Sequence, residues 1–197
     1  MIGLARMRRL PRKAAVLAKR LARDIRGIAA LEFAMIVPVL IIMLLGCTEV
    51  GDASTVSLRM INISGAVSDM VARCTNINSS DLKDIMRISD ELLGRYSVEG
   101  LYIEVVAIKA DAAGALTVAW SYDRNGTQPL ATGAPFSGVP PGLISPNGTL
   151  IISTSSYRYH SPIGHFIHGT IFLSHTAYDS PRVGPVTYTP SGTSCTY

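Results

Sequence analysis

The chain has 197 residues, of which 48% are hydrophobic and 16% are charged. This length suits one domain of ordinary size with accessory segments, and the apolar content excludes an intrinsically disordered chain. The formal net charge is +4, but residues 1–26 hold nine Arg and Lys against one acid, while the rest has nine bases and thirteen acids. The basic character therefore belongs to an N-terminal leader, and we expect no nucleic-acid partner.

An apolar run follows this leader directly. Residues 28–47 read IAALEFAMIVPVLIIMLLGC and contain a single charge, at Glu32. Twenty helical residues rise about 30 Å, which is the thickness of the hydrocarbon core of a bilayer. The basic flank predicts a cytoplasmic N-terminus. We therefore expect a basic cytoplasmic leader at 1–27, a single transmembrane helix at 28–48 and a periplasmic (extracytoplasmic) domain at 49–197.

Several kinds of N-terminal segment remain open from these residues. A secretory signal peptide needs small residues at a cleavage site after its apolar core, where this chain has Cys47-Thr48-Glu49. The pair Arg8-Arg9 suggests a twin-arginine signal, although more basic residues separate it from the apolar run. Leu44-Leu45-Gly46-Cys47 resembles the box that precedes the acylated cysteine of a lipoprotein. The last alternative is an uncleaved anchor that carries a periplasmic binding domain.

Glu32 separates this run from an ordinary anchor, because an ionisable residue inside a membrane span is costly and by default marks a functional site. The string 26–33, RGIAALEF, resembles the type IV prepilin processing site. In that family a prepilin peptidase cuts after the Gly and methylates the new N-terminus. The resemblance implies that Gly27 and Ile28 form the processing site. It also implies that Glu32, with Phe33 beside it, meets the terminal amine of a neighbouring subunit, since pairing offsets much of the cost of burying either charge.

Within that family, the segment looks most like the TadE-like minor pilins, or pseudopilins, of the tight-adherence (Flp, type IVb) pilus system. The chain supplies the typical features in order: Arg26, Gly27, Ala29, Ala30, Glu32, Phe33, Pro38, Gly46, Glu49 and Gly51. The resemblance covers about residues 23–75 and implies a structural role in pilus assembly for adherence, without enzymatic activity or cofactors. The implied location is the bacterial inner membrane or the pilus itself. The implied partners are inner-membrane lipid, the prepilin peptidase, other pilins or pseudopilins and the pilus platform.

The helical pattern continues beyond the apolar run. Apolar residues from Val56 to Cys74 recur at spacings of four and three, so we expect one helix from about Ile28 to Arg73, with a kink at Pro38. A second helix is expected to begin at a Ser80 or Asp81 N-cap and to stop at Gly94. Its predicted buried residues are Leu82, Ile85, Met86, Leu92 and Leu93.

The last hundred residues change to a period of two. Residues 101–108 and 116–122 alternate around the turn Asp111-Ala112-Ala113-Gly114, which predicts a hairpin. Further strands are expected at about 149–159 and 169–178, joined by Ser161-Pro162-Ile163-Gly164, with an irregular loop at 126–148 and a flexible tail at 183–197. The predicted fold class is α+β, with an antiparallel sheet of about four strands and helices on one face.

The cysteines and histidines predict little further chemistry. Cys47 is expected to be a small apolar residue in the span, and Cys74 and Cys195 to form either a disulfide or two free thiols. His165 and His168 would face opposite sides of a strand and have no acid or Cys within four residues, so no metal site is expected. The chain has no nucleophile elbow, Walker loop or Cys-x-x-Cys motif.

Overall fold

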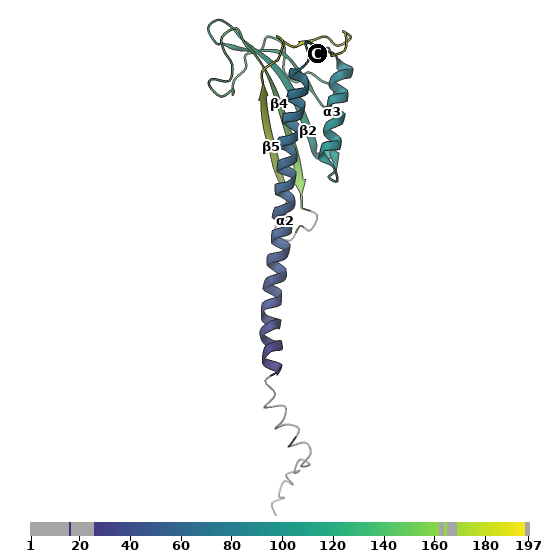
Figure 1. Ribbon diagram of the computed structural model, residues 1–197, viewed down its shortest axis with the longest axis vertical. Coiled ribbons are helices and arrows are strands. Elements are labelled where there is room, and N and C mark those ends of the chain that lie inside the picture. The colour runs from purple at the N-terminus through teal and green to yellow at the C-terminus, as the bar shows by residue number, and fades with distance from the viewer. Residues whose placement is uncertain (1–15, 17–25, 162–163, 165–168, 196–197) are drawn as a thin grey trace, which may run out of the picture. The chain divides into compact units, whose positions relative to one another are not determined.

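The computed structural model describes residues 16, 26–161, 164 and 169–195. Most of the basic leader, residues Pro162 and Ile163 of the predicted turn, and His165 and His168 lie outside the described residues. The chain divides into two compact units, Met1–Cys47 and Thr48–Tyr197, which are treated separately below. The elements are α2 (Arg26–Ala72), β1 (Asn76–Ile77), α3 (Ser79–Leu93), a short 3₁₀ helix η1 (Val98–Gly100), β2 (Leu101–Ala110), β3 (Leu116–Asp123), β4 (Thr149–His160), β5 (Thr170–Asp179) and β6 (Thr187–Tyr188) (Figure 1).

The predicted α+β class is confirmed. β2, β3, β4 and β5 form an antiparallel sheet in the order β3-β2-β4-β5, so each predicted strand is present within a few residues of its expected bounds. The β2–β3 hairpin turns at Asp111, whose carboxylate accepts hydrogen bonds from the amides of Ala113 and Ala115 at 2.9 and 2.8 Å. Gly114 supplies the positive φ of 85° that this turn requires.

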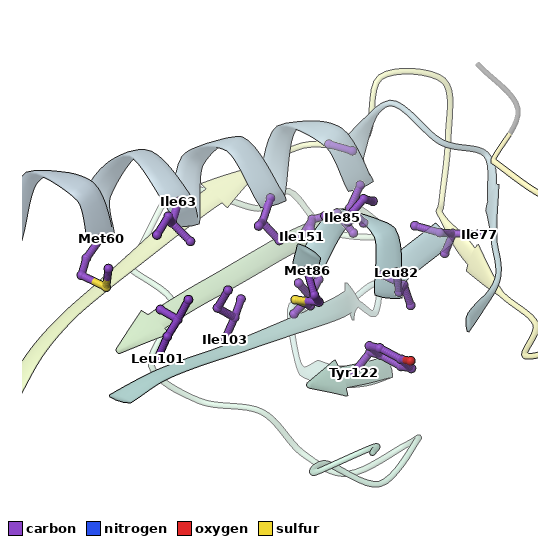
Figure 2. Packing of buried hydrophobic residues seen from close by; sticks show 14 of the residues in the cluster. Met60, Ile63, Ile77, Leu82, Ile85, Met86, Leu101, Ile103, Tyr122 and Ile151 are labelled. Carbon is purple, nitrogen blue, oxygen red and sulfur yellow. The ribbon is translucent and has the colours of Figure 1, made fainter. Parts of the chain in front are cut away.

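The main core lies between the sheet and two helices. α2 and α3 cover one face of the sheet, as expected from their apolar spacing (Figure 1). Figure 2 shows Met60 and Ile63 of α2 over the face of the sheet from which Leu101 and Ile103 of β2 project. All four side chains are buried. Ser155 of β4 adds a buried polar link, because its hydroxyl donates to the backbone carbonyl of Met60 at 2.8 Å.

The start of α3 differs from the prediction. The N-cap is Asn78, and the expectation of Ser80 or Asp81 is wrong. The Asn78 side chain accepts hydrogen bonds from the amides of Ser80 and Asp81, and Asp81 accepts one in return from the Asn78 amide, which completes a capping box. The helix ends at Gly94 as expected, but Leu92 is 37% exposed and does not belong to the buried face.

The loop between β3 and β4 has a structural role that the sequence did not indicate. Leu130, Phe136, Val139 and Ile144 pack against a second apolar cluster on the other face of the sheet, over β2, β3 and β4. Loop residues 133–136 also exchange backbone hydrogen bonds with residues 116–118 of β3. The loop therefore covers part of one face of the sheet and the outer edge of β3.

The C-terminal segment is held against the domain, so the expectation of a flexible tail from residue 183 is not met for the residues described. β6 pairs in parallel with β1, with Asn76 opposite Thr187 and Ile77 opposite Tyr188. The indole N–H of Trp120 donates to the backbone carbonyl of buried Val186 at 2.8 Å. These contacts join residues far apart in the sequence, which is why local patterns missed them.

Candidate processing and assembly segment

The first unit presents an exposed apolar helix. The part of α2 between Gly27 and Cys47 has its large side chains uncovered, with exposed fractions of 56% for Ile28 and 67% for Phe33. α2 is the one helix, among the described residues, that is long and apolar enough to cross a membrane. A soluble monomer rarely exposes so much contiguous apolar surface. This segment therefore needs an apolar environment, and a membrane anchor satisfies that need.

Glu32 is the one acid on this apolar part of α2. It lies in the second turn, four residues after Ile28, so the two side chains share one face of the helix. Helical side chains lean toward the N-terminus, which directs the carboxylate toward the turn that contains Ile28. The side chain is exposed on the isolated subunit. The geometry therefore leaves this carboxylate accessible to a group on another molecule.

Gly27 has no role in the fold that requires glycine. It lies in the first turn of α2 without a positive φ, and a Cβ added there would meet no atom within 4 Å. Glycine in a helix costs about 1 kcal/mol relative to alanine. The fold therefore sets no requirement for glycine at residue 27.

Pro38 lies inside α2, which continues on both sides of it. Proline removes one backbone hydrogen bond and crowds the carbonyl four residues earlier, which is that of Ala34. A membrane tolerates such a freed carbonyl when neighbouring groups satisfy it. The predicted kink remains a prediction.

A polar cluster surrounds the first turns of α2 in the second unit. Glu49 is fully buried, and the carboxylate of Asp52 pairs with the guanidinium of Arg95 and accepts a hydrogen bond from the Tyr96 hydroxyl at 3.4 Å. Tyr159 is also buried, and burial raises the pKa of its hydroxyl. A cavity of about 640 Å³ opens beside this cluster, between α2, η1 and β4.

Arg59 links α2 to α3, a role that the sequence analysis missed. Its guanidinium donates to the backbone carbonyls of Leu92 and Leu93, both at 2.9 Å, and lies 5.5 Å from the centre of the Tyr96 ring. It thereby satisfies carbonyls that the end of α3 leaves without helical partners. The sequence offered one signal for this role, namely that Arg59 is a cation that lies outside the apolar stripe of α2.

The two distant cysteines are brought together at the far end of α2. Cys74 and Cys195 form a disulfide with their Cα atoms 5.2 Å apart, and Cys47 is free and exposed. The Cys195 amide also donates to the carboxylate of Asp81 at 2.8 Å. Nearby, Asp69 pairs with Arg73 and Arg182, and these cations lower its pKa. The C-terminal segment is thus attached to α2 and α3 by a covalent bond and by polar contacts.

The described residues hold no group of three His, Cys, Asp or Glu side chains arranged to bind a metal ion. His160 contacts the hydroxyl of Thr170 across the β4–β5 pair at 3.3 Å. His175 lies on β5 and is half-buried. Neither histidine is placed with a partner set that indicates catalysis.

Comparison with known proteins gives one match. The family model for TadE-like proteins matches residues 27–64, about a fifth of the chain. No curated protein and no solved structure matches the chain. The matched segment contains Gly27, Ile28, Glu32, Phe33 and Pro38.

Proposed function

Because residues 27–64 form a TadE-like segment, which associates the chain with the tight-adherence (Tad) pilus, we propose that it is a minor pilin or pseudopilin of that pilus. It takes part in assembly or initiation of the filament as a structural subunit, and it is not an enzyme. The observation that carries the proposal is the single carboxylate at Glu32, one helical turn beyond Ile28 within the otherwise apolar segment 28–48 of α2.

The proposed topology follows from charge and length. The basic leader stays in the cytoplasm, residues 28–48 cross the inner membrane, and residues 49–197 lie in the periplasm. A disulfide between Cys74 and Cys195 supports an oxidising compartment for the second unit. Inner-membrane lipid is then the first partner of the exposed apolar helix, and the pilus platform is the second.

The proposed maturation step is cleavage of the Gly27–Ile28 peptide bond by a prepilin peptidase. Water is added across the bond, which leaves a carboxylate on Gly27 and an α-amino group on Ile28. An α-amino group has a pKa near 8 in its unperturbed state, so it is largely cationic at neutral pH. Glu32 of one subunit then pairs with this amine on a neighbouring pilin, which sets the register between helices. The fold does not need glycine at residue 27, and this supports a requirement imposed by the peptidase.

The test compares two glycines of the same helix. Gly27→Ala is expected to block maturation, whereas Gly46→Ala is expected to leave it intact. A Cβ at either position would meet no atom within 4 Å, so neither change disturbs the fold of the subunit. The readout is the size of the chain on an immunoblot of cells with and without the peptidase. Normal processing of Gly27→Ala would contradict the proposed cleavage site.

A second comparison separates processing from assembly. Glu32→Ala and the isosteric Glu32→Gln should both be cut after Gly27 but fail to enter the pilus machinery, because each removes the charge that pairs with the amine. Glu32→Asp keeps the charge and should retain part of the function. Full piliation with Glu32→Gln would show that the ion pair is not needed.

A further inference from the structure

β5 is the last strand at one margin of the sheet, and no described residue pairs with its outer edge (Figure 1). It is ten residues long and, among the described residues, it pairs with β4 and with no other strand. In an antiparallel sheet every second residue of an edge strand directs its amide and carbonyl away from the neighbouring strand. The outer side of β5 therefore offers a row of backbone donors and acceptors over its whole length.

The two edges of this sheet differ in whether other parts of the chain cover them. The edge of β3 is covered by loop residues 133–136, which hydrogen-bond to it. β5 has no such cover among the described residues. Its residues 170–178 read TIFLSHTAY, without Lys, Arg, Asp, Glu, Gly or Pro. Natural proteins usually protect a long edge strand with charges, proline or a bulge, so an unprotected edge indicates that another chain pairs with it.

The side of α2 beside β5 carries two large apolar residues that are exposed. The hydroxyl of Ser68 donates to the carboxylate of Asp179 at the end of β5, which identifies the side of α2 that faces this strand. Ile61 lies seven residues earlier, on the same side of the helix. It is 40% exposed, and Leu58, one turn further back, is 61% exposed. We call the outer edge of Thr170–Asp179 together with Leu58 and Ile61 the β5 surface.

We propose that the β5 surface binds an extended, uncharged segment of a different protein, which adds to the sheet as a fifth strand. Main-chain hydrogen bonds to β5 supply affinity, and the side chains of the added strand that face α2 contact Ile61 and Leu58. The added strand should alternate apolar and polar residues, with the apolar ones toward α2. A charged residue there would lose hydration without a formally charged partner on the strand, because residues 170–178 hold no Lys, Arg, Asp or Glu.

A second copy of this chain is the poorer occupant. Its β3 edge is already covered by its own loop, so copies cannot extend one sheet from β5 to β3. The remaining self-pairing, β5 against β5, closes after two subunits, and a cross-link between two copies in the test below would reveal it. The proposal goes beyond the role of the apolar helix and holds whether or not Gly27 is cut.

Cross-linking in cells tests the proposal with the full chain. Phe172 is 73% exposed on β5, so a photoreactive phenylalanine analogue at this position leaves the core intact. The cross-linked peptide is then mapped by mass spectrometry. The expected product joins residue 172 to an uncharged, alternating segment of another protein. Leu58→Lys and Ile61→Lys should each lower its yield about tenfold, because either places an unpaired charge in the contact.

Ile88→Lys is the matched control, because Ile88 is a 46% exposed apolar residue on α3, away from β5. It should leave the yield unchanged. A cross-link to a second copy, a cross-link to a charged or helical segment, or no cross-link at all would overturn the proposal.

Hydrogen exchange provides an independent measurement on the purified full chain in detergent. The probe is a ten-residue peptide of alternating valine and threonine, and the control is the same peptide with a central proline. The first peptide should slow exchange about tenfold at every second amide of residues 170–178, and the control should not. No protection with the first peptide, or equal protection with both, would overturn strand addition.

Discussion

Removal of the Cys74–Cys195 disulfide should have the largest effect on stability of the changes considered for the second unit. The perturbation is the double substitution Cys74→Ala with Cys195→Ala, made in a Cys47→Ala background so that no thiol remains. The two cysteines are 121 residues apart in the sequence. Closing a loop of that length removes about 5 kcal/mol of conformational entropy from the unfolded chain in the loop-closure model.

The measured loss should be somewhat smaller than this figure. Several contacts of the C-terminal segment do not depend on the disulfide, among them the β1–β6 pair and the hydrogen bond from Trp120 to Val186. The double variant should therefore lose about 3–5 kcal/mol of unfolding free energy, within the range seen when native disulfides are removed from small domains.

Trp120 makes this change directly visible. It is the one tryptophan of the chain, it is 5% exposed, and its ring centre lies 5.6 Å from that of Tyr188 on the C-terminal segment. If the segment separates when the disulfide is absent, the indole loses its hydrogen bond and its cover, and its emission shifts to longer wavelength. Urea unfolding of the full chain in detergent micelles, followed by this emission, gives both the free energy of unfolding and the emission wavelength of the folded state.

The matched control is the Cys47→Ala variant with the disulfide intact. The reasoning is refuted if the double variant unfolds within about 0.5 kcal/mol of this control and shows the same emission, because surface changes without structural consequence stay within that range. Addition of a reductant to the control should reproduce the behaviour of the double variant.

Two further substitutions test the account of the sheet. Burial and the nearby Asp123 raise the pKa of Glu104, so its contribution to stability is largest below pH 4.5 and is lost as pH rises through the folded-state pKa. Glu104→Gln should raise the urea midpoint at about pH 7 and have little effect below about pH 4, and an equal gain at both pH values would contradict this assignment. Ser155→Ala should cost about 1 kcal/mol, because it removes the buried hydrogen bond to Met60. Ser153→Ala is its control and should cost less, because the Ser153 hydroxyl is buried with no hydrogen-bond partner among the described residues; equal losses would show that the bond from Ser155 contributes nothing.

The elements that the sequence predicted well are those defined by local periodicity. The stripe from Val56 to Cys74, the alternation of β2 and β3, and the turn at Asp111 each depend on residues close together in the chain, and the structure has all three. The N-cap of α3 was misplaced because Asn78, Ser80 and Asp81 all favour capping, and the side-chain geometry decides among them.

The features that the sequence did not predict depend on distant contacts. β1 and β6 are two residues long, too short to show a period, and they pair across more than a hundred residues. The loop that covers β3 is rich in Gly and Pro, which indicates irregular structure but not where it docks. For the candidate site, the motif around Gly27 and Glu32 was readable from the sequence because it is contiguous. The open edge of β5 became visible only from the order of strands.

The identity of the mature N-terminus tests the central claim most directly. The chain is purified from cells that contain an active prepilin peptidase, and its N-terminal peptide is identified by mass spectrometry. The account predicts a chain that begins with N-methylated Ile28. A chain that retains Met1, or one that begins at an acylated Cys47, would contradict it and leave an uncleaved anchor or a lipoprotein in its place.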